Sequence, residues 1–142
     1  MDTNFILSRA KDITKSLSGA VGLSTSPEQK EVNSLHQEIQ MLSGIKKQHF
    51  RGLFSEEAWN LFKKLNLSIL NKVAQLFCQA GELFEHSDQD HLALIEFKNA
   101  QTILQFVEDQ DYNYSLERIH LIDDIAVKIN YRDENAIDLL DM

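Results

Sequence analysis

The 142-residue sequence has little of what builds tight turns, cross-links or membrane spans. It contains five glycines, one proline and one cysteine. A fold made of β-strands needs many turns, so this scarcity of glycine and proline favours long helices. The single cysteine, Cys78, excludes a disulfide within the chain. No apolar run reaches the length of a membrane span, and charged residues interrupt the N-terminal apolar positions, unlike in a signal peptide. We therefore expect a cytoplasmic protein that does not attach to membranes.

Motifs for catalysis and cofactor binding are also absent from the sequence. The glycines are scattered and form no phosphate-binding loop, and no nucleophile-elbow, zinc-protease or EF-hand spacing occurs. His86, Asp88, Asp90 and His91 surround one turn, where we interpret Ser87 and the two aspartates as helix caps and not as parts of a metal site. We expect a protein that is not an enzyme and that needs no cofactor or metal ion.

The charge is negative overall and unevenly distributed. The net charge of −8 disfavours nucleic acid as a partner, because phosphate backbones attract basic proteins. Residues 1–72 carry ten Lys and Arg against seven Asp and Glu, whereas residues 73–142 carry four against fifteen. The acidic half is either a solvated surface or a face for a basic partner.

The spacing of apolar residues predicts an all-α protein with one helical bundle domain at 27–142. Before it, residues 1–26 are expected to form an amphipathic helix and a flexible linker. A helix-period pattern runs over 55–86, and we divide it near Asn66–Ser68 because a single globular helix of that length is unusual. The predicted helices of the domain are 27–42, 55–65, 68–86, 89–107, 115–129 and 133–140.

The helix predicted at 27–42 carries a narrow apolar seam. Val32, Leu35, Ile39 and Leu42 are spaced three, four and three residues apart, as in a short coiled coil. If this seam is exposed, Leu35 and Ile39 would contact a partner in an obligate complex.

Small residues alternate with aromatic ones between residues 77 and 100. One helix carries Ala80 and Gly81 between two phenylalanines, and the next carries Ala93 and Ala100 around Phe97. Side chains normally hold helix axes about 8–10 Å apart, so small residues at these positions predict a closer crossing. The short turn between the helices predicts an antiparallel hairpin.

This stretch resembles a tetratricopeptide repeat, whose pattern is W-x₂-L-G-x₂-Y followed by A-x₃-F and a proline. Phe77, Ala80, Gly81 and Phe84 stand at the first four positions, and "ALIEF" supplies the next two. Gln105 replaces the proline, and no second copy is found. The resemblance covers residues 74–107 and implies an all-α bundle centred on a tetratricopeptide-like antiparallel hairpin that holds a peptide in a groove.

The same stretch is also similar to MIT domains, which are three-helix bundles. Their second helix reads A-L-x-x-Y-x-x-A, which "ALIEFKNAQTIL" matches with Phe97 in place of Tyr. The likeness to their third helix is loose, because Ala136 lies one residue too far from Tyr131 in "INYRDENAIDLL". Both resemblances imply binding of a peptide or helix from another protein.

The expected function is that of a protein-binding adaptor. Because the apolar set of the first hairpin helix faces the core, four polar residues of that helix are the candidates to line a groove: Lys72, Gln75, Gln79 and Glu82. Asp123 and Asp124 add acidic charge to the candidate site. The expected partner is therefore another protein with a basic or amphipathic segment, and the two chains would form a hetero-oligomer. Two alternatives stay open, a structural subunit of an obligate helical complex and a small acidic chaperone-like protein.

Overall fold

The structure, a computed structural model, describes the backbone of residues 27–140 and the side chains of residues 28–132. The helix and linker predicted at 1–26 lie outside the described residues. Within them the fold is all-α, as predicted. Its elements are α2 (Pro27–Ser43), the 3₁₀ helix η1 (Lys47–His49), α3 (Glu56–Phe62), α4 (Leu67–His86), α5 (Asp90–Gln110) and α6 (Leu116–Leu140). No helix of the described part is both long and apolar enough to cross a membrane.

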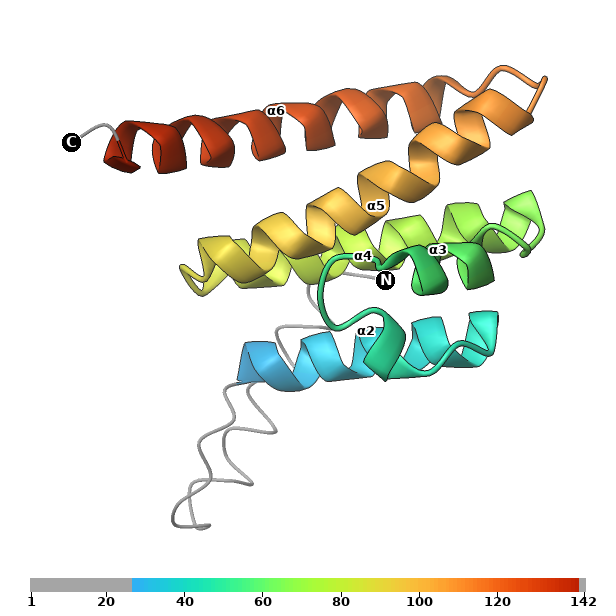
Figure 1. Cartoon of the computed structure of the whole chain (residues 1–142), viewed down its shortest axis with the longest axis horizontal. Coiled ribbons are helices and arrows are strands. Elements are labelled where there is room, and N and C mark those ends of the chain that lie inside the picture. Colours follow the sequence, from blue (N-terminus) through green and yellow to red (C-terminus); the bar gives the residue numbers. More distant parts are fainter. Residues whose placement is uncertain (1–26, 141–142) are drawn as a thin grey trace, which may run out of the picture.

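The helices are stacked side by side, with the hairpin of α4 and α5 in the middle (Figure 1). Helix α2 packs on α4 at one side of the hairpin, and α6 packs on α5 at the other. Helices α4 and α5 make the most extensive contact and run antiparallel, which confirms the predicted hairpin.

Helix boundaries follow local signals that the sequence contains. The Ser55 hydroxyl accepts a hydrogen bond from the Ala58 N–H at the start of α3, and the Asn66 side chain accepts one from the Ile69 N–H at the start of α4. The pattern over 55–86 is therefore two helices, as predicted. Gly44 ends α2 with a φ of +73°, a conformation that glycine adopts without strain.

Two boundary predictions are wrong. Helix α6 is continuous to Leu140, where two helices were expected, because its sequence has no glycine or proline to break it. Of the three residues expected to be caps at the turn before α5, Ser87 is the C-cap of α4, but Asp88 and Asp90 make no capping hydrogen bond among the described residues. Gln89 is the N-cap without a side-chain hydrogen bond, whereas the Ser87 hydroxyl bonds to the carbonyl oxygens of Leu83 and Phe84 and so ends α4.

The core corrects the interpretation of the seam on α2. Leu35 and Ile39 are buried, at 2 % and 0 % exposure, in the same cluster as residues of α4. Helix α4 of the same chain thus covers the seam, and an exposed position for Leu35 and Ile39 is wrong. Next to them Phe50, Phe54, Phe62 and Phe77 form a cluster of edge-to-face and stacked rings.

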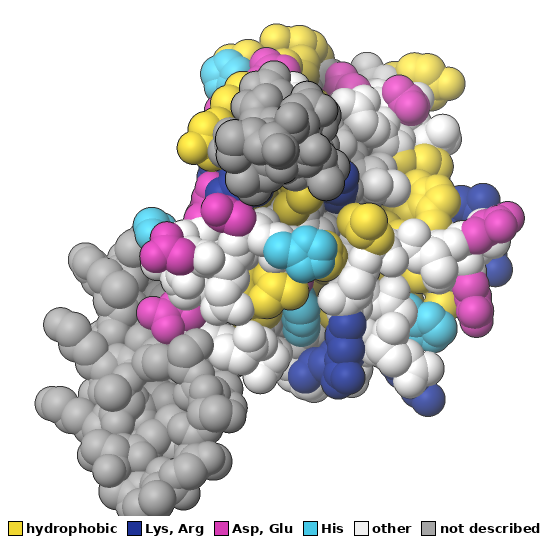
Figure 2. All heavy atoms as spheres, turned by 60° about the vertical axis from the view of Figure 1, so that its left-hand side comes forward, with side chains coloured by type: hydrophobic (Ala, Val, Ile, Leu, Met, Phe, Trp, Pro, Cys, Tyr) yellow, Lys and Arg dark blue, Asp and Glu magenta, His cyan; other side chains and the backbone are white. Residues whose placement is uncertain are grey.

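The close crossing of α4 and α5 occurs where the small residues predict it. Ala80, Ala93 and Ala100 are fully buried. A Cβ atom on Gly81 would lie 2.5 Å from Cε1 of Phe97, so the ring fills the space that the missing side chain leaves. On the surface shown in Figure 2, apolar side chains occur in separate groups among charged and polar ones.

Candidate partner-binding groove

A groove lies between α4 and α6. It encloses a volume of about 300 Å³, and Cys78 and Leu121 contribute to its lining. Four of the residues predicted for partner binding line it: Gln75, Gln79, Glu82 and Asp124. The fold therefore places three predicted residues of α4 and one of α6 in the same groove, although Asp124 is more than 40 positions away in the sequence.

Helical spacing explains why these side chains share the groove. On α4, Gln75, Gln79 and Glu82 are four and three residues apart, which places them on one stripe. On α6, Glu117 and Asp124 are seven residues apart, or about two turns, and His120 lies between them. Each helix therefore contributes one polar stripe to a wall of the groove.

The groove is acidic. It contains three carboxylates, Glu82, Glu117 and Asp124. The Nζ atom of Lys128 lies 3.8 Å from Glu82 but closer, at 3.2 Å, to Glu85, which does not line the groove. Because Lys128 is shared with Glu85, it offsets the charge of Glu82 only in part.

Ion pairs of the buried Arg118 with two partly exposed carboxylates hold the start of α6 in place. Arg118 is 4 % exposed and pairs with Glu108 at 2.7 Å and with Asp111 at 3.0 Å. Its guanidinium also donates a hydrogen bond to the carbonyl oxygen of Asn113. The backbone N–H of Asn113 and then Arg118 hold the pKa of Asp111 below its usual range. We call these contacts of Arg118 with Glu108, Asp111 and Asn113 the Arg118 clamp. The clamp fixes the turn between α5 and α6, and it thereby positions α6 as one wall of the groove.

The middle of α6 is anchored on the hairpin. Lys128 and Arg132 lie over the Phe97 ring, 5.0 and 5.5 Å from its centroid, and both pair with Glu85. These hydrogen bonds hold the pKa of Glu85 below its usual range despite an opposing effect of burial. The Phe97 ring therefore packs against Gly81, where α4 and α5 cross, and also contacts Lys128 and Arg132 of α6.

The thiol in the groove has the character of a core residue. Burial, reinforced by Glu82, raises the pKa of Cys78 to about 12. His120 lines the same groove, but no hydrogen bond links it to Cys78 in the described residues. A protonated thiol without a base is a poor nucleophile.

We expect Cys78 in the folded protein to react at least about 100-fold more slowly with iodoacetamide at pH 8 than in guanidinium chloride, because only the thiolate reacts. The rate in the folded protein should keep rising with pH toward the pKa of about 12. Mass spectrometry of the alkylated fraction over time measures both rates. Equal rates in the two states would show that the thiol is exposed and ionises normally.

The remaining predicted residues lie outside the groove. Lys72 is exposed on α4 and does not line it, and neither does Asp123, which is exposed on α6 next to Asp124. Conversely, Glu117 and His120 line the groove and were not predicted. Glu117 lies seven residues and His120 four residues before Asp124. This helical spacing was the available signal, but it does not reveal that α6 faces α4.

Within residues 28–132 no three His, Cys, Asp or Glu side chains are placed to hold a metal ion. Comparison with models of known families, with curated proteins and with solved structures finds no match to this chain. The groove and its charge are therefore the basis for a functional proposal.

Proposed function

We propose that the protein is a non-enzymatic adaptor that holds a basic or amphipathic segment of another protein in the groove between α4 and α6. The observation that carries this proposal is the set of three groove carboxylates, Glu82, Glu117 and Asp124. Lysine or arginine side chains of a partner would pair with them. The apolar side of an amphipathic segment would lie on Leu121.

We further propose that α4 and α5 form a tetratricopeptide-like hairpin, with α6 in the place of the first helix of a following repeat. Such repeats hold peptides beside the first helix of the hairpin, and α4 is that helix here. In an MIT-like bundle α6 would close against both other helices. The cavity of about 300 Å³ between α4 and α6 favours the repeat-like arrangement.

The rival hypothesis is an obligate subunit, which needs an apolar surface. The seam on α2 does not provide it, because Leu35 and Ile39 are buried. Exposed apolar side chains do occur elsewhere on the described surface, and three of them share one helix, namely Leu116, Val127 and Tyr131 on α6. An assembly through these residues would associate at a rate that responds little to salt, and light scattering after size-exclusion chromatography would show a stable oligomer.

The adaptor proposal predicts that partner binding depends on Asp124 and not on its neighbour. Peptides selected from a random displayed library against the protein should be enriched in lysine and arginine. Asp124→Asn should weaken their binding by about 1.5- to 5-fold, the range of an exposed ion pair. Asp123→Asn removes the same charge one residue away, outside the groove, and is the matched control.

Salt dependence provides a second measurement on the same peptides. Attraction between exposed charges is screened beyond about 8 Å at physiological salt, so the association rate should fall between about 50 and 500 mM salt. Stopped-flow fluorescence measures this rate. Selected peptides without basic enrichment, or equal binding to the Asp123 and Asp124 variants, would rule out the acidic groove as the binding site.

A further inference from the structure

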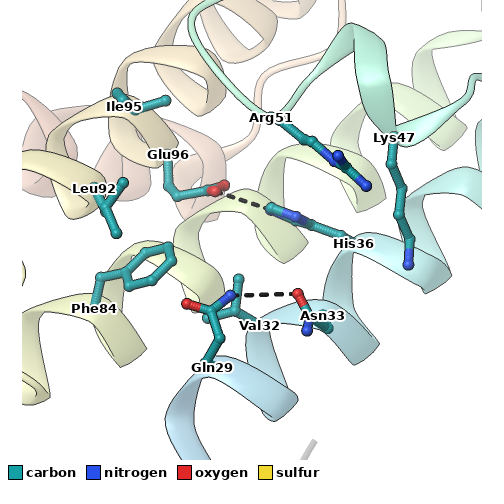
Figure 3. A pocket seen from close by; sticks show the side chains of 10 residues that line it. All are labelled: Gln29, Val32, Asn33, His36, Lys47, Arg51, Phe84, Leu92, Ile95 and Glu96. Atoms are coloured by element: carbon teal, nitrogen blue, oxygen red, sulfur yellow. Dashed lines mark hydrogen bonds and ion pairs between the residues drawn. The ribbon is translucent and has the colours of Figure 1, made fainter. Parts of the chain in front are cut away.

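A second cavity lies on a different side of α4 and α5, where α2 and the connection to α3 meet the hairpin. Its volume is about 420 Å³, within the range of small-molecule sites. Figure 3 shows its side chains, which come from α2, from η1 and the segment after it, and from the facing parts of α4 and α5. None of its residues lines the groove between α4 and α6.

A buried pair of ionisable side chains forms one part of this cavity. Nε2 of His36 lies 2.8 Å from Oε1 of Glu96, and the two side chains are 10 % and 3 % exposed. The second carboxylate oxygen, Oε2, is buried and has no hydrogen-bond partner among the described residues. Burial raises the pKa of Glu96, and the hydrogen bond from His36 opposes this shift. A buried acceptor without a donor destabilises the fold, so a ligand that supplies an N–H to Oε2 would recover part of that loss.

Two cationic side chains stand on another side of the cavity. Lys47 and Arg51 line it, and neither has an ion-pair partner among the described residues. In Figure 3 both side chains extend from the η1 region on the same side of the cavity as His36.

The wall opposite the cations is apolar. Phe84, Leu92 and Ile95 line it, and Figure 3 shows them on the far side of Glu96 from Lys47 and Arg51. The carboxylate of Glu96 thus lies in the middle of the cavity, with the cations of Lys47 and Arg51 on one side of it and the apolar wall on the other. An anion alone would leave Glu96 unsatisfied, and a cation alone would be repelled by Lys47 and Arg51.

We propose that this cavity binds a small zwitterion with an apolar side group, of which a free apolar amino acid is the simplest. Its ammonium group pairs with Glu96, its carboxylate pairs with Lys47 and Arg51, and its side group packs on Phe84 and Leu92. The terminal torsion of a glutamate side chain is broad, so a small rotation of the Glu96 carboxylate presents Oε2 to the ammonium group.

Isothermal titration calorimetry of the full chain with three probes tests this assignment. Leucine carries both charges, isoamylamine lacks the carboxylate, and 4-methylpentanoate lacks the ammonium group. We expect leucine to bind at least about tenfold more tightly than either analogue, because each lost charged hydrogen bond weakens binding by that factor or more. Equal binding of either analogue, or no heat from leucine at millimolar concentration, would overturn the proposal.

Two variants and a control locate the binding. Glu96→Gln keeps the shape of the side chain and removes its charge, and Arg51→Gln changes an exposed residue that has no ion-pair partner among the described residues. Each should weaken leucine binding at least about tenfold. Lys63→Gln also removes an exposed positive charge, but outside the cavity, and should bind leucine as the wild type does.

The Arg51 variant decides the outcome if Glu96→Gln does not fold. Unchanged leucine affinity in Arg51→Gln would overturn the proposal. N-acetylleucine, which has no ammonium group, distinguishes a free amino acid from the C-terminus of a peptide. If it binds as tightly as leucine, the cavity recognises a peptide end, and the zwitterion assignment is wrong.

Discussion

Replacing Phe97 by alanine is expected to lower the free energy of unfolding by about 3–5 kcal/mol, the usual range for removing a buried aromatic side chain. Phe97 is 1 % exposed, fills the space above Gly81 and lies under Lys128 and Arg132. Its loss would leave a cavity at the crossing of α4 and α5 and remove the surface on which α6 rests. Urea unfolding followed by helical circular dichroism measures the change.

Phe106→Ala is the matched control for this experiment. Phe106 has the same side chain on the same helix but is only half-buried, against Trp59. We expect its replacement to cost clearly less than that of Phe97. If both variants lose the same stability, or if Phe97→Ala loses less than about 0.5 kcal/mol, the crossing does not have the role assigned to it here.

The crossing could be predicted because its cause is local. The alternation of small and aromatic residues allows two helices to approach closely at the small positions and fills the space beside them, whatever surrounds the pair. The N-caps at Ser55 and Asn66 could be predicted for the same reason. Each consists of one hydrogen bond between a side chain and a backbone N–H three residues later, so it depends only on the local sequence. The positions of the three polar α4 residues in the groove, Gln75, Gln79 and Glu82, likewise follow from the period of the helix.

The wall that α6 contributes to the groove could not be predicted in this way. Its placement depends on the Arg118 clamp and on the contacts of Lys128 and Arg132 with Phe97 and Glu85. The pairs with Glu85 join residues more than 40 positions apart in the sequence, and no periodicity marks them. Without that placement, Asp123 and Asp124 look equivalent, although only Asp124 reaches the groove.

The cavity beside α2 was missed for a similar reason. His36 and Glu96 are 60 residues apart, and each by itself resembles an ordinary polar residue on an amphipathic helix. The seam on α2 was interpreted as exposed because its spacing is typical of a coiled coil. A seam of this kind has the same sequence pattern whether its partner is another chain or α4 of the same chain.

Replacing Gly81 by leucine is expected to destabilise the fold by about 1–3 kcal/mol or more, through overpacking. Any side chain at this position meets the Phe97 ring, whose three nearest atoms would lie 2.5 to 2.8 Å from the new Cβ. The ring cannot easily move away, because α6 covers it through Lys128 and Arg132. Gly52→Leu is the control, since a Cβ there meets nothing within 4 Å.

A double-mutant cycle separates the steric clash from a general effect of the substitution. In Gly81→Ala the clash is opposed by a gain of about 0.8–1.0 kcal/mol in helix propensity, so the single variant alone is ambiguous. Combining it with Phe97→Leu replaces the ring by a smaller, more adaptable side chain and should relieve the clash. We therefore expect the double variant to be more stable than the sum of the two single changes predicts, by at least about 0.5 kcal/mol in urea unfolding. Simple additivity would mean that Gly81 and Phe97 do not determine the approach of α4 and α5.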